Sequence, residues 1–233
     1  MVKTNLEKNI SSYIGRLLRD HFGRGPGNVI CTVSGQYVVV HMTSFLSSME
    51  KSLINNDQTV YVEKIRDLMV DGLVKDITSF IELNSGQSVE EFYYDWELQN
   101  QTGMMIALLS SSNDEHPSTP VNQYKNSGIV IQEINRLSKE VQKTPENTYS
   151  IMIDSRNLLI IREGIFISLE KELIRLGFQE TLRIAKRNLE KQLIAESKEL
   201  FEESLEAELT DFFIDWNFEK DRSVILFNLS PSK

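Results

Sequence analysis

Apolar and polar positions alternate along this chain with two periods, and the order of these periods predicts the elements. An apolar residue recurs every three to four positions from residue 10 to residue 22, which is typical of one face of a helix. Two short apolar stretches, 29–33 and 37–42, then predict a β-hairpin around Ser34-Gly35-Gln36. Within 88–98 large apolar side chains occupy every second position, so we expect a half-buried strand paired with 104–109.

Two helices are expected between these hairpins. Ser47 and Glu50 have the spacing of a capping box, which predicts a short helix that runs to about Asn55. A longer helix follows, and its predicted apolar face comprises Val62, Ile65, Leu68, Met69, Leu73, Ile77, Phe80 and Ile81. Arg66 falls off this face with other charged residues. Gly72 lies inside the helix at a cost of ~1 kcal/mol relative to alanine, which close approach of another backbone would explain.

The whole pattern occurs twice. Phe-Tyr-Tyr-Asp-Trp at 92–96 returns as Phe-Phe-Ile-Asp-Trp at 212–216, an offset of 120 positions (215 − 95 = 120), and the same offset relates Ser-Met-Glu-Lys at 48–51 to Ser-Leu-Glu-Lys at 168–171. We therefore predict an α+β fold of two tandem α-β-β-α-α-β-β modules, each an antiparallel sheet with helices packed on one face. The predicted boundaries are 1–112 for copy one, 113–127 for a polar linker, and 128–233 for a diverged copy two.

Composition narrows the function classes. A formal net charge of −9 argues against nucleic-acid binding and against anionic membrane surfaces, although it leaves a local basic patch open. We find no apolar run of the ~18 residues that span a bilayer and no signal-peptide pattern at the start. The single cysteine, Cys31, excludes an intrachain disulfide. We expect a cytoplasmic protein that is at most peripheral at the inner face of the membrane.

No pattern in the sequence is typical of a catalytic or metal site. The three histidines, His21, His41 and His116, lack the spacing of zinc ligands, and no nucleophile elbow or phosphate loop is present. We therefore predict that the protein is not an enzyme and that it binds no cofactor. A hydrolase that uses Asp95 and Asp215 is a weaker alternative, because the repeat places both on the strand face opposite the aromatic residues. The simpler interpretation is that each aspartate bonds to a turn or to a cross-strand neighbour.

The turn Gly23-Arg24-Gly25-Pro26-Gly27-Asn28 is the best candidate for binding. Glycine suits a left-handed helix cap and proline cannot continue a helix, so the simplest interpretation is a helix stop with a tight turn. Arg24 beside exposed backbone amides is also suited to hold an anion. The candidate ligand-binding or docking residues are therefore Gly23, Arg24, Gly25, Pro26, Asn28, Asp95 and Asp215.

This turn, the apolar hairpin after it and the helix start at Leu46-Ser47-Ser48-Met49-Glu50 resemble the MpsC-like family of bacterial proteins. Residues 23–26 match its Gly-Arg-Gly-Pro turn, Ser47 stands where threonine is usual, Glu50 matches, and Asp95 corresponds to its strand aspartate. Copy two keeps Glu170, Lys171, Asp215 and one proline, Pro145, but not the glycines, so it resembles a diverged duplicate.

The resemblance implies a non-enzymatic accessory or regulatory protein of a cation-linked system that generates membrane potential or takes up bicarbonate. Its partners would be membrane ion- or bicarbonate-transport subunits, reached by protein–protein docking. The alternative is a small-ligand or anion-sensing module that uses the turn at Arg24. Homo-oligomerisation is a further expectation, because each module leaves a sheet edge that must be paired or covered.

Overall fold

The computed structural model describes residues 4–110 and 124–231. The chain divides into two compact units, Met1–Glu115 and His116–Lys233, here called module one and module two. Most of the predicted linker, residues 113–123, lies outside the described residues.

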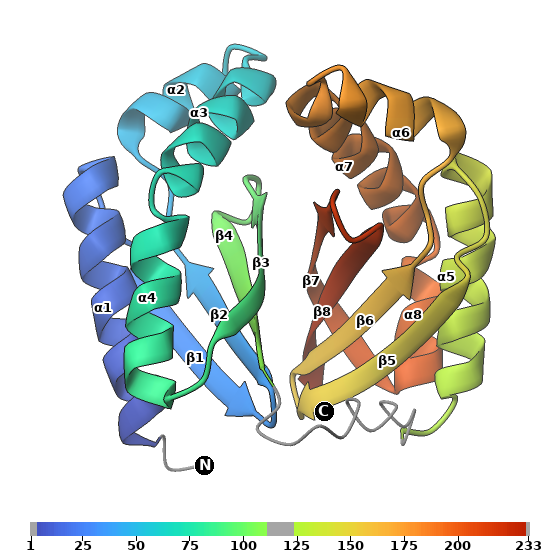
Figure 1. Cartoon of the computed structure of the whole chain (residues 1–233), viewed down its shortest axis with the longest axis horizontal. Coiled ribbons are helices and arrows are strands. Elements are labelled where there is room, and N and C mark those ends of the chain that lie inside the picture. The colour runs from blue at the N-terminus through green and yellow to red at the C-terminus, as the bar shows by residue number, and fades with distance from the viewer. Residues whose placement is uncertain (1–3, 111–123, 232–233) are drawn as a thin grey trace. The chain divides into compact units, whose positions relative to one another are not determined.

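Module one follows the expected order of elements, except that three helices rather than two lie between its hairpins (Figure 1). They are α1 (Asn5–Phe22), β1 (Asn28–Ser34), β2 (Tyr37–Thr43), α2 (Ser48–Ile54), α3 (Thr59–Asp71), α4 (Val74–Ser85), β3 (Val89–Glu97) and β4 (Thr102–Leu109). The four strands form an antiparallel sheet in the order β1-β2-β4-β3, so the second hairpin adds to the first through β2 and β4. The helices cover one face of this sheet, which confirms the α+β prediction.

Module two repeats this topology. Its elements are α5 (Ser127–Val141), β5 (Asn147–Asp154), β6 (Asn157–Glu163), α6 (Ser168–Arg175), α7 (Gln179–Glu196), α8 (Lys198–Leu205), β7 (Ala207–Asn217) and β8 (Arg222–Pro231). The strand order β5-β6-β8-β7 is that of module one, and every pairing is again antiparallel. The two-module fold predicted from the internal repeat is therefore present in the structure.

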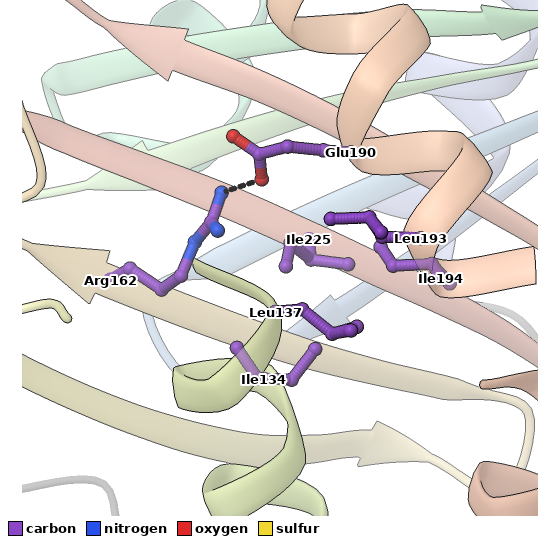
Figure 2. Close-up of a pocket in the computed structure, with 7 residues that line it drawn as sticks. All are labelled: Ile134, Leu137, Arg162, Glu190, Leu193, Ile194 and Ile225. Carbon is purple, nitrogen blue, oxygen red and sulfur yellow. Dashed lines mark ion pairs between the residues drawn. The ribbon is translucent and has the colours of Figure 1, made fainter. Parts of the chain in front are cut away.

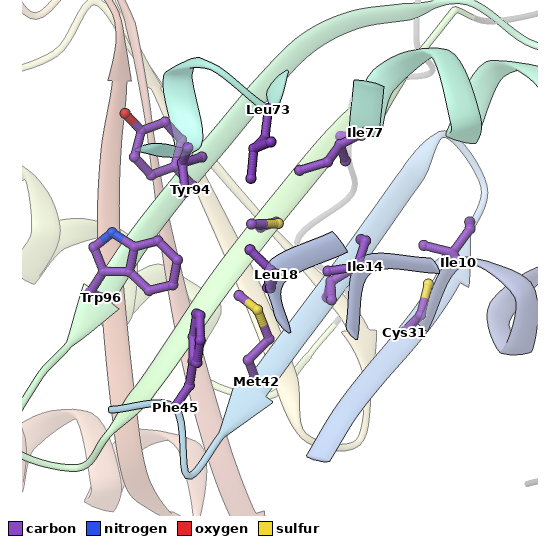
Figure 3. Packing of buried hydrophobic residues seen from close by; sticks show 14 of the residues in the cluster. Ile10, Ile14, Leu18, Cys31, Met42, Phe45, Leu73, Ile77, Tyr94 and Trp96 are labelled. Atoms are coloured by element: carbon purple, nitrogen blue, oxygen red, sulfur yellow. The ribbon is translucent and has the colours of Figure 1, made fainter. Parts of the chain in front are cut away.

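The core of module one lies between its helices and its sheet (Figure 3). Ile10, Ile14 and Leu18 project from α1 at helical spacing and are fully buried. They pack in one cluster with alternate residues of β2, such as Met42, and with Trp96 of β3. Full burial of an aliphatic side chain stabilises a fold by about 1.5–3 kcal/mol, so this periodicity fixes which face of each element points inward.

The one long helix expected in each module is divided in two. In module one the break falls at Gly72 and Leu73, where the Leu73 N–H donates to the Val70 carbonyl oxygen at 2.7 Å. In module two it falls at Ser197. An added Cβ on Gly72 would meet only the carbonyl oxygens of its own helix, so no other part of the described chain packs closely there.

The inward face of α3 also differs from the prediction. Val62, Arg66 and Val70 are buried, whereas Ile65 and Leu68 are exposed. The prediction that Arg66 lies off the packed face is wrong. It excluded the residue because of its charge, and a charge can be buried once it is paired.

Candidate functional site

The glycines of the turn after α1 are explained by backbone geometry. Gly23 caps α1 in the left-handed conformation, with φ of 69°. A Cβ on Gly25 would lie 3.0 Å from the Arg19 Cβ and 3.1 Å from the Gly15 carbonyl oxygen, so a larger residue would push the turn away from the helix. The Gly27 N–H donates to the Thr43 carbonyl oxygen at 2.9 Å, which ties the turn to the end of β2. The turn is thus a rigid connection.

Arg24 is held at the solvent surface by this rigid turn, as is Asn28, whereas Pro26 is buried. Arg24 has no hydrogen bond or ion pair within the described part of the chain. It follows the C-terminal end of α1, where the helix carries partial negative charge, so its cation is favourable there while a bound anion gains nothing from the helix. An acidic group that binds Arg24 therefore needs further contacts nearby, which a protein partner supplies and a small free anion does not.

Module two lacks this feature. Its first helix ends at Val141 and its first strand begins at Asn147, so its turn is as long as the turn between Phe22 and Asn28, but the strand begins 119 rather than 120 positions after its counterpart (147 − 28 = 119). A bulge in β5 between Met152 and Asp154 restores the register. The Glu146 N–H donates to the Glu163 carbonyl oxygen at 2.9 Å, as Gly27 does to Thr43, so the anchor remains although the glycines are gone.

Asp95 and Asp215 lie in β3 and β7, at one edge of their sheets. Both lie on the face of their strand opposite to Trp96 and Trp216, which belong to the helix-side cores. Asp215 Oδ1 lies 3.5 Å from Arg183 Nε of α7, an ion pair that explains this carboxylate structurally. Module one has Glu63 at the position of Arg183, so the two aspartates have different surroundings despite the repeat.

A buried cation, which the sequence pattern missed, lies at the centre of module one. Arg66 is fully buried, and its Nε donates to Glu50 Oε1 at 2.7 Å. Its Nη2 donates to the Phe45 carbonyl oxygen at 2.7 Å. The guanidinium carbon lies 4.6 Å from the centre of the Phe45 ring and 4.8 Å from that of Trp96, distances typical of cation–π contacts. The pair thus joins α2, α3 and the sheet.

Glu50 is also the residue that caps α2. The Ser47 N–H donates to Glu50 Oε2 at 2.6 Å, and the Glu50 N–H donates to Ser47 Oγ at 3.2 Å, which confirms the predicted capping box. Burial raises the pKa of Glu50, but the hydrogen bond and charge of Arg66 together with the bonds to Ser47 outweigh burial and lower this pKa below its ordinary value. Glu50 is therefore a carboxylate that two elements hold in its charged form.

Module two repeats this arrangement with a different cation. Lys186 Nζ lies 2.6 Å from Glu170 Oε1, and both residues are buried. The ammonium lies 5.6 Å from the centre of the Trp216 ring and also donates to Gln142 Oε1. Each of these pairing residues stands 120 positions after its module-one counterpart (186 − 66 = 120 and 170 − 50 = 120). Positions 66 and 186 are both basic, and positions 50 and 170 are both acidic. A comparison of the two copies would therefore have identified the pair from sequence.

The comparison with known families agrees with this duplication. One family model, described as "Na+-translocating membrane potential-generating system (MpsC)", matches residues 2–111 and 129–231, one match for each module. The chain belongs to the MpsC family. No curated protein and no solved structure matches it. Both MpsC modules therefore keep the buried ion pair, while only module one keeps the glycine-rich turn.

The second MpsC module has a further buried ion pair. Arg162 Nη2 lies 2.6 Å from Glu190 Oε2, and the two side chains point toward one another (Figure 2). Arg162 also donates to Ser223 Oγ at 2.8 Å and to Ser138 Oγ at 2.9 Å. Glu190 Oε1 lies 3.6 Å from Lys186 Nζ, so the charges form a continuous series that ends at Glu170. The corresponding residues of the first MpsC module are Met42, Val70, Gly103 and Leu18.

A pocket borders this second pair, lined by Ile134, Leu137, Arg162, Glu190, Leu193, Ile194 and Ile225. Its empty volume of about 200 Å³ includes solvent at its mouth, and only about 10 Å³ admits the centre of a water-sized sphere. That is room for about one water molecule, so the pocket does not fit an organic substrate. No group of three or more potential metal-ligating residues occurs in 4–110 or 124–231. Nor, within these same ranges, is any helix long and apolar enough to cross a membrane.

Proposed function

We propose that this chain is a non-enzymatic accessory protein of a Na+-translocating, membrane-potential-generating system, and that it acts by docking to membrane subunits. The observation that carries the proposal is the match of the MpsC family to both modules. Partner subunits that move Na+ or bicarbonate are the expected binding proteins. The chain would then work in the cytoplasm and at the inner face of the membrane, held there through protein contacts.

The turn of module one is the proposed contact. Arg24 is exposed and without a partner in the described chain, and the glycines around it fix the backbone that presents it. Because this backbone is already fixed, the turn loses little main-chain freedom when it binds, which favours affinity. An acidic loop of a membrane subunit is the partner chemistry that fits. Module two, which lacks the turn, would serve as the structural half.

The test is gentle crosslinking of the tagged full-length protein in its native cells, followed by identification of membrane proteins that co-purify. Recovery of a multi-span ion- or bicarbonate-transport subunit is expected with the wild type and with Lys75→Glu, a control at another exposed basic residue. Arg24→Glu is expected to lose this subunit. Recovery of soluble proteins alone would overturn the accessory function, and unchanged recovery with Arg24→Glu would overturn the turn as the contact.

A second candidate function is anion sensing at the same turn, which the unpaired charge of Arg24 favours. It predicts that phosphate, bicarbonate or a small carboxylate raises the melting temperature of the wild type but not that of Arg24→Ala. The docking function comes first, because the negative end of α1 opposes a small anion at Arg24, whereas a partner protein offsets the same cost with contacts beyond its acidic group.

A further inference from the structure

Helix α3 of module one exposes an apolar stripe that no described element covers. Tyr61, Ile65 and Leu68 are 60%, 44% and 62% exposed, and Gly72 at the end of the helix is exposed as well. A monomer rarely leaves three large apolar side chains in one row on a helix unless the row is a contact surface. These four residues are here called the α3 stripe.

The spacing of the stripe identifies the kind of partner. Positions 61, 65, 68 and 72 follow each other at intervals of four, three and four, which is the spacing of the two apolar positions in a coiled-coil seam. The partner surface that fits such a seam is another helix with a matching seam. Module two has Thr181, Ala185 and Asn188 where module one has Tyr61, Ile65 and Leu68, so it lacks the stripe.

The α3 stripe is complementary to itself when two copies run antiparallel. In that direction Tyr61 of one helix lies opposite Gly72 of the other, and Ile65 lies opposite Leu68. The largest side chain of the stripe thus meets the position with none, where an added Cβ would have only its own helix near it. In the parallel direction Tyr61 would meet Tyr61 and Gly72 would meet Gly72, which leaves a clash at one end and a void at the other.

Charge adds to this complementarity. Lys64 and Asp71 flank the same side of the stripe, each directly before a seam residue, and antiparallel helices bring these flanking positions of the two chains together. Lys64 of one copy therefore meets Asp71 of the other, twice in a two-fold dimer. Lys64 is exposed and makes no ion pair in the described chain, while the Tyr94 hydroxyl donates to Asp71 Oδ1 at 2.7 Å and holds that carboxylate in place.

We propose that a second copy of this chain binds the α3 stripe, in a two-fold dimer with antiparallel α3 helices. One helix seam is small beside a standard interface of about 1,600 Å², so the dimer is expected to dissociate in the micromolar range. This surface differs from the turn at Arg24, and the dimer is independent of the proposed docking function.

Sedimentation equilibrium of the full chain from low micromolar to about millimolar concentration tests the proposal. The mass is expected to rise toward twice 26.8 kDa. The variant Tyr61→Thr/Ile65→Ala/Leu68→Asn carries the residues of module two and is expected to stay monomeric. The control Leu83→Ser removes an apolar side chain that is 83% exposed on α4, outside the stripe, and is expected to dimerise like the wild type.

Four further variants test the direction of the helices. Gly72→Leu fills the position opposite Tyr61, and Lys64→Glu places two acidic groups together, so each is expected to weaken the dimer at least tenfold. Under oxidation, a mixture of Ile65→Cys and Leu68→Cys chains is expected to yield more mixed disulfide dimers than like-with-like dimers. A wild type that stays monomeric throughout, or a triple variant that dimerises as well as Leu83→Ser, would overturn the proposal. An excess of like-with-like disulfides would overturn the antiparallel direction.

Discussion

The guanidinium of Arg66 donates a hydrogen bond to the carboxylate of Glu50 over 2.7 Å in the interior of module one. The same two positions of module two hold Lys186 and Glu170, whose charged atoms lie 2.6 Å apart. In both modules the carboxylate also accepts the backbone N–H that precedes its helix, from Ser47 in one and from Ile167 in the other. A single acidic side chain thus caps the N-terminus of one helix and binds the next helix to it.

Removal of the cation is expected to be costly. Arg66→Ala leaves the Glu50 carboxylate buried without a counter-charge, so we expect a loss of about 3–5 kcal/mol in the free energy of unfolding of module one. Arg66→Lys, which introduces the residue of module two, retains the charge and is expected to lose less. Urea unfolding in a Trp216→Phe background, where Trp96 is the remaining tryptophan, measures module one alone. Equal losses for the two variants would contradict the assigned role of the charge.

Acidification is expected to weaken module one through Glu50. The pKa of this carboxyl is lower in the folded protein than its ordinary value of 4.5, so the unfolded chain binds more protons as the pH falls. The stability that Glu50 contributes is therefore complete above its unfolded pKa and is lost as the pH falls through the folded pKa. Urea unfolding at pH 7 and in steps from pH 5 to pH 3 measures this loss. Glu50→Gln should be less stable at pH 7, and its stability should fall less on acidification than that of the wild type.

The sequence was sufficient to predict the strands, the first helices and the duplication. Strand periodicity and capping boxes are local signals, and their recurrence at a constant offset gave each signal a second, independent observation. Ser47 and Glu50 illustrate this, since both bonds of the predicted capping box are present. The predicted turn was also confirmed in its simplest interpretation, as a helix stop followed by a tight connection.

The buried charges could not be predicted by the same reasoning. Arg66 interrupts an apolar period, and its partner Glu50 comes from another helix, so a pattern along one element assigns it to the surface. Arg162 and Glu190 are alike in this respect, because one lies on a strand and the other on a helix 28 positions later (190 − 162 = 28). Only the pairing in three dimensions offsets the free-energy cost of burying such groups. That pairing joins different elements, so it cannot be predicted from the periodicity of one element.

The ion pair of Arg162 and Glu190 is expected to be replaceable by the apolar residues of module one without loss of stability. Glu190→Val alone leaves Arg162 without its counter-charge and should cost about 3–5 kcal/mol, whereas Arg162→Met/Glu190→Val reproduces Met42 and Val70 of module one. We expect the double variant to be close to the wild type or up to about 4 kcal/mol more stable than it. Urea unfolding in a Trp96→Phe background, followed by the fluorescence of Trp216, measures this difference in stability. A double variant as unstable as Glu190→Val would show that the pair itself stabilises the module.

At Gly103, replacement by the residue of module two, a serine, is expected to destabilise module one. It pairs with Trp96 across the hairpin, and an added Cβ would lie 2.5 Å from the Trp96 ring. In module two Ser223 occupies this position, and its hydroxyl accepts the Arg162 N–H, a donor that module one replaces with Met42. Gly103→Ser therefore combines overpacking with an unpaired buried hydroxyl, and we expect a loss of about 2–4 kcal/mol.

Tryptophan fluorescence during urea unfolding, again in the Trp216→Phe background, measures the loss caused by Gly103→Ser. The control is Gly128→Ser in α5, measured in the Trp96→Phe background so that Trp216 reports on module two; an added Cβ there meets nothing within 4 Å, and the stability of module two is expected to change little. A shift in the emission of folded Trp96 should accompany the loss, because the ring must move to admit the side chain. Full stability with unchanged emission would mean that the ring already has room, and the difference between Gly103 and Ser223 would then have no packing cause.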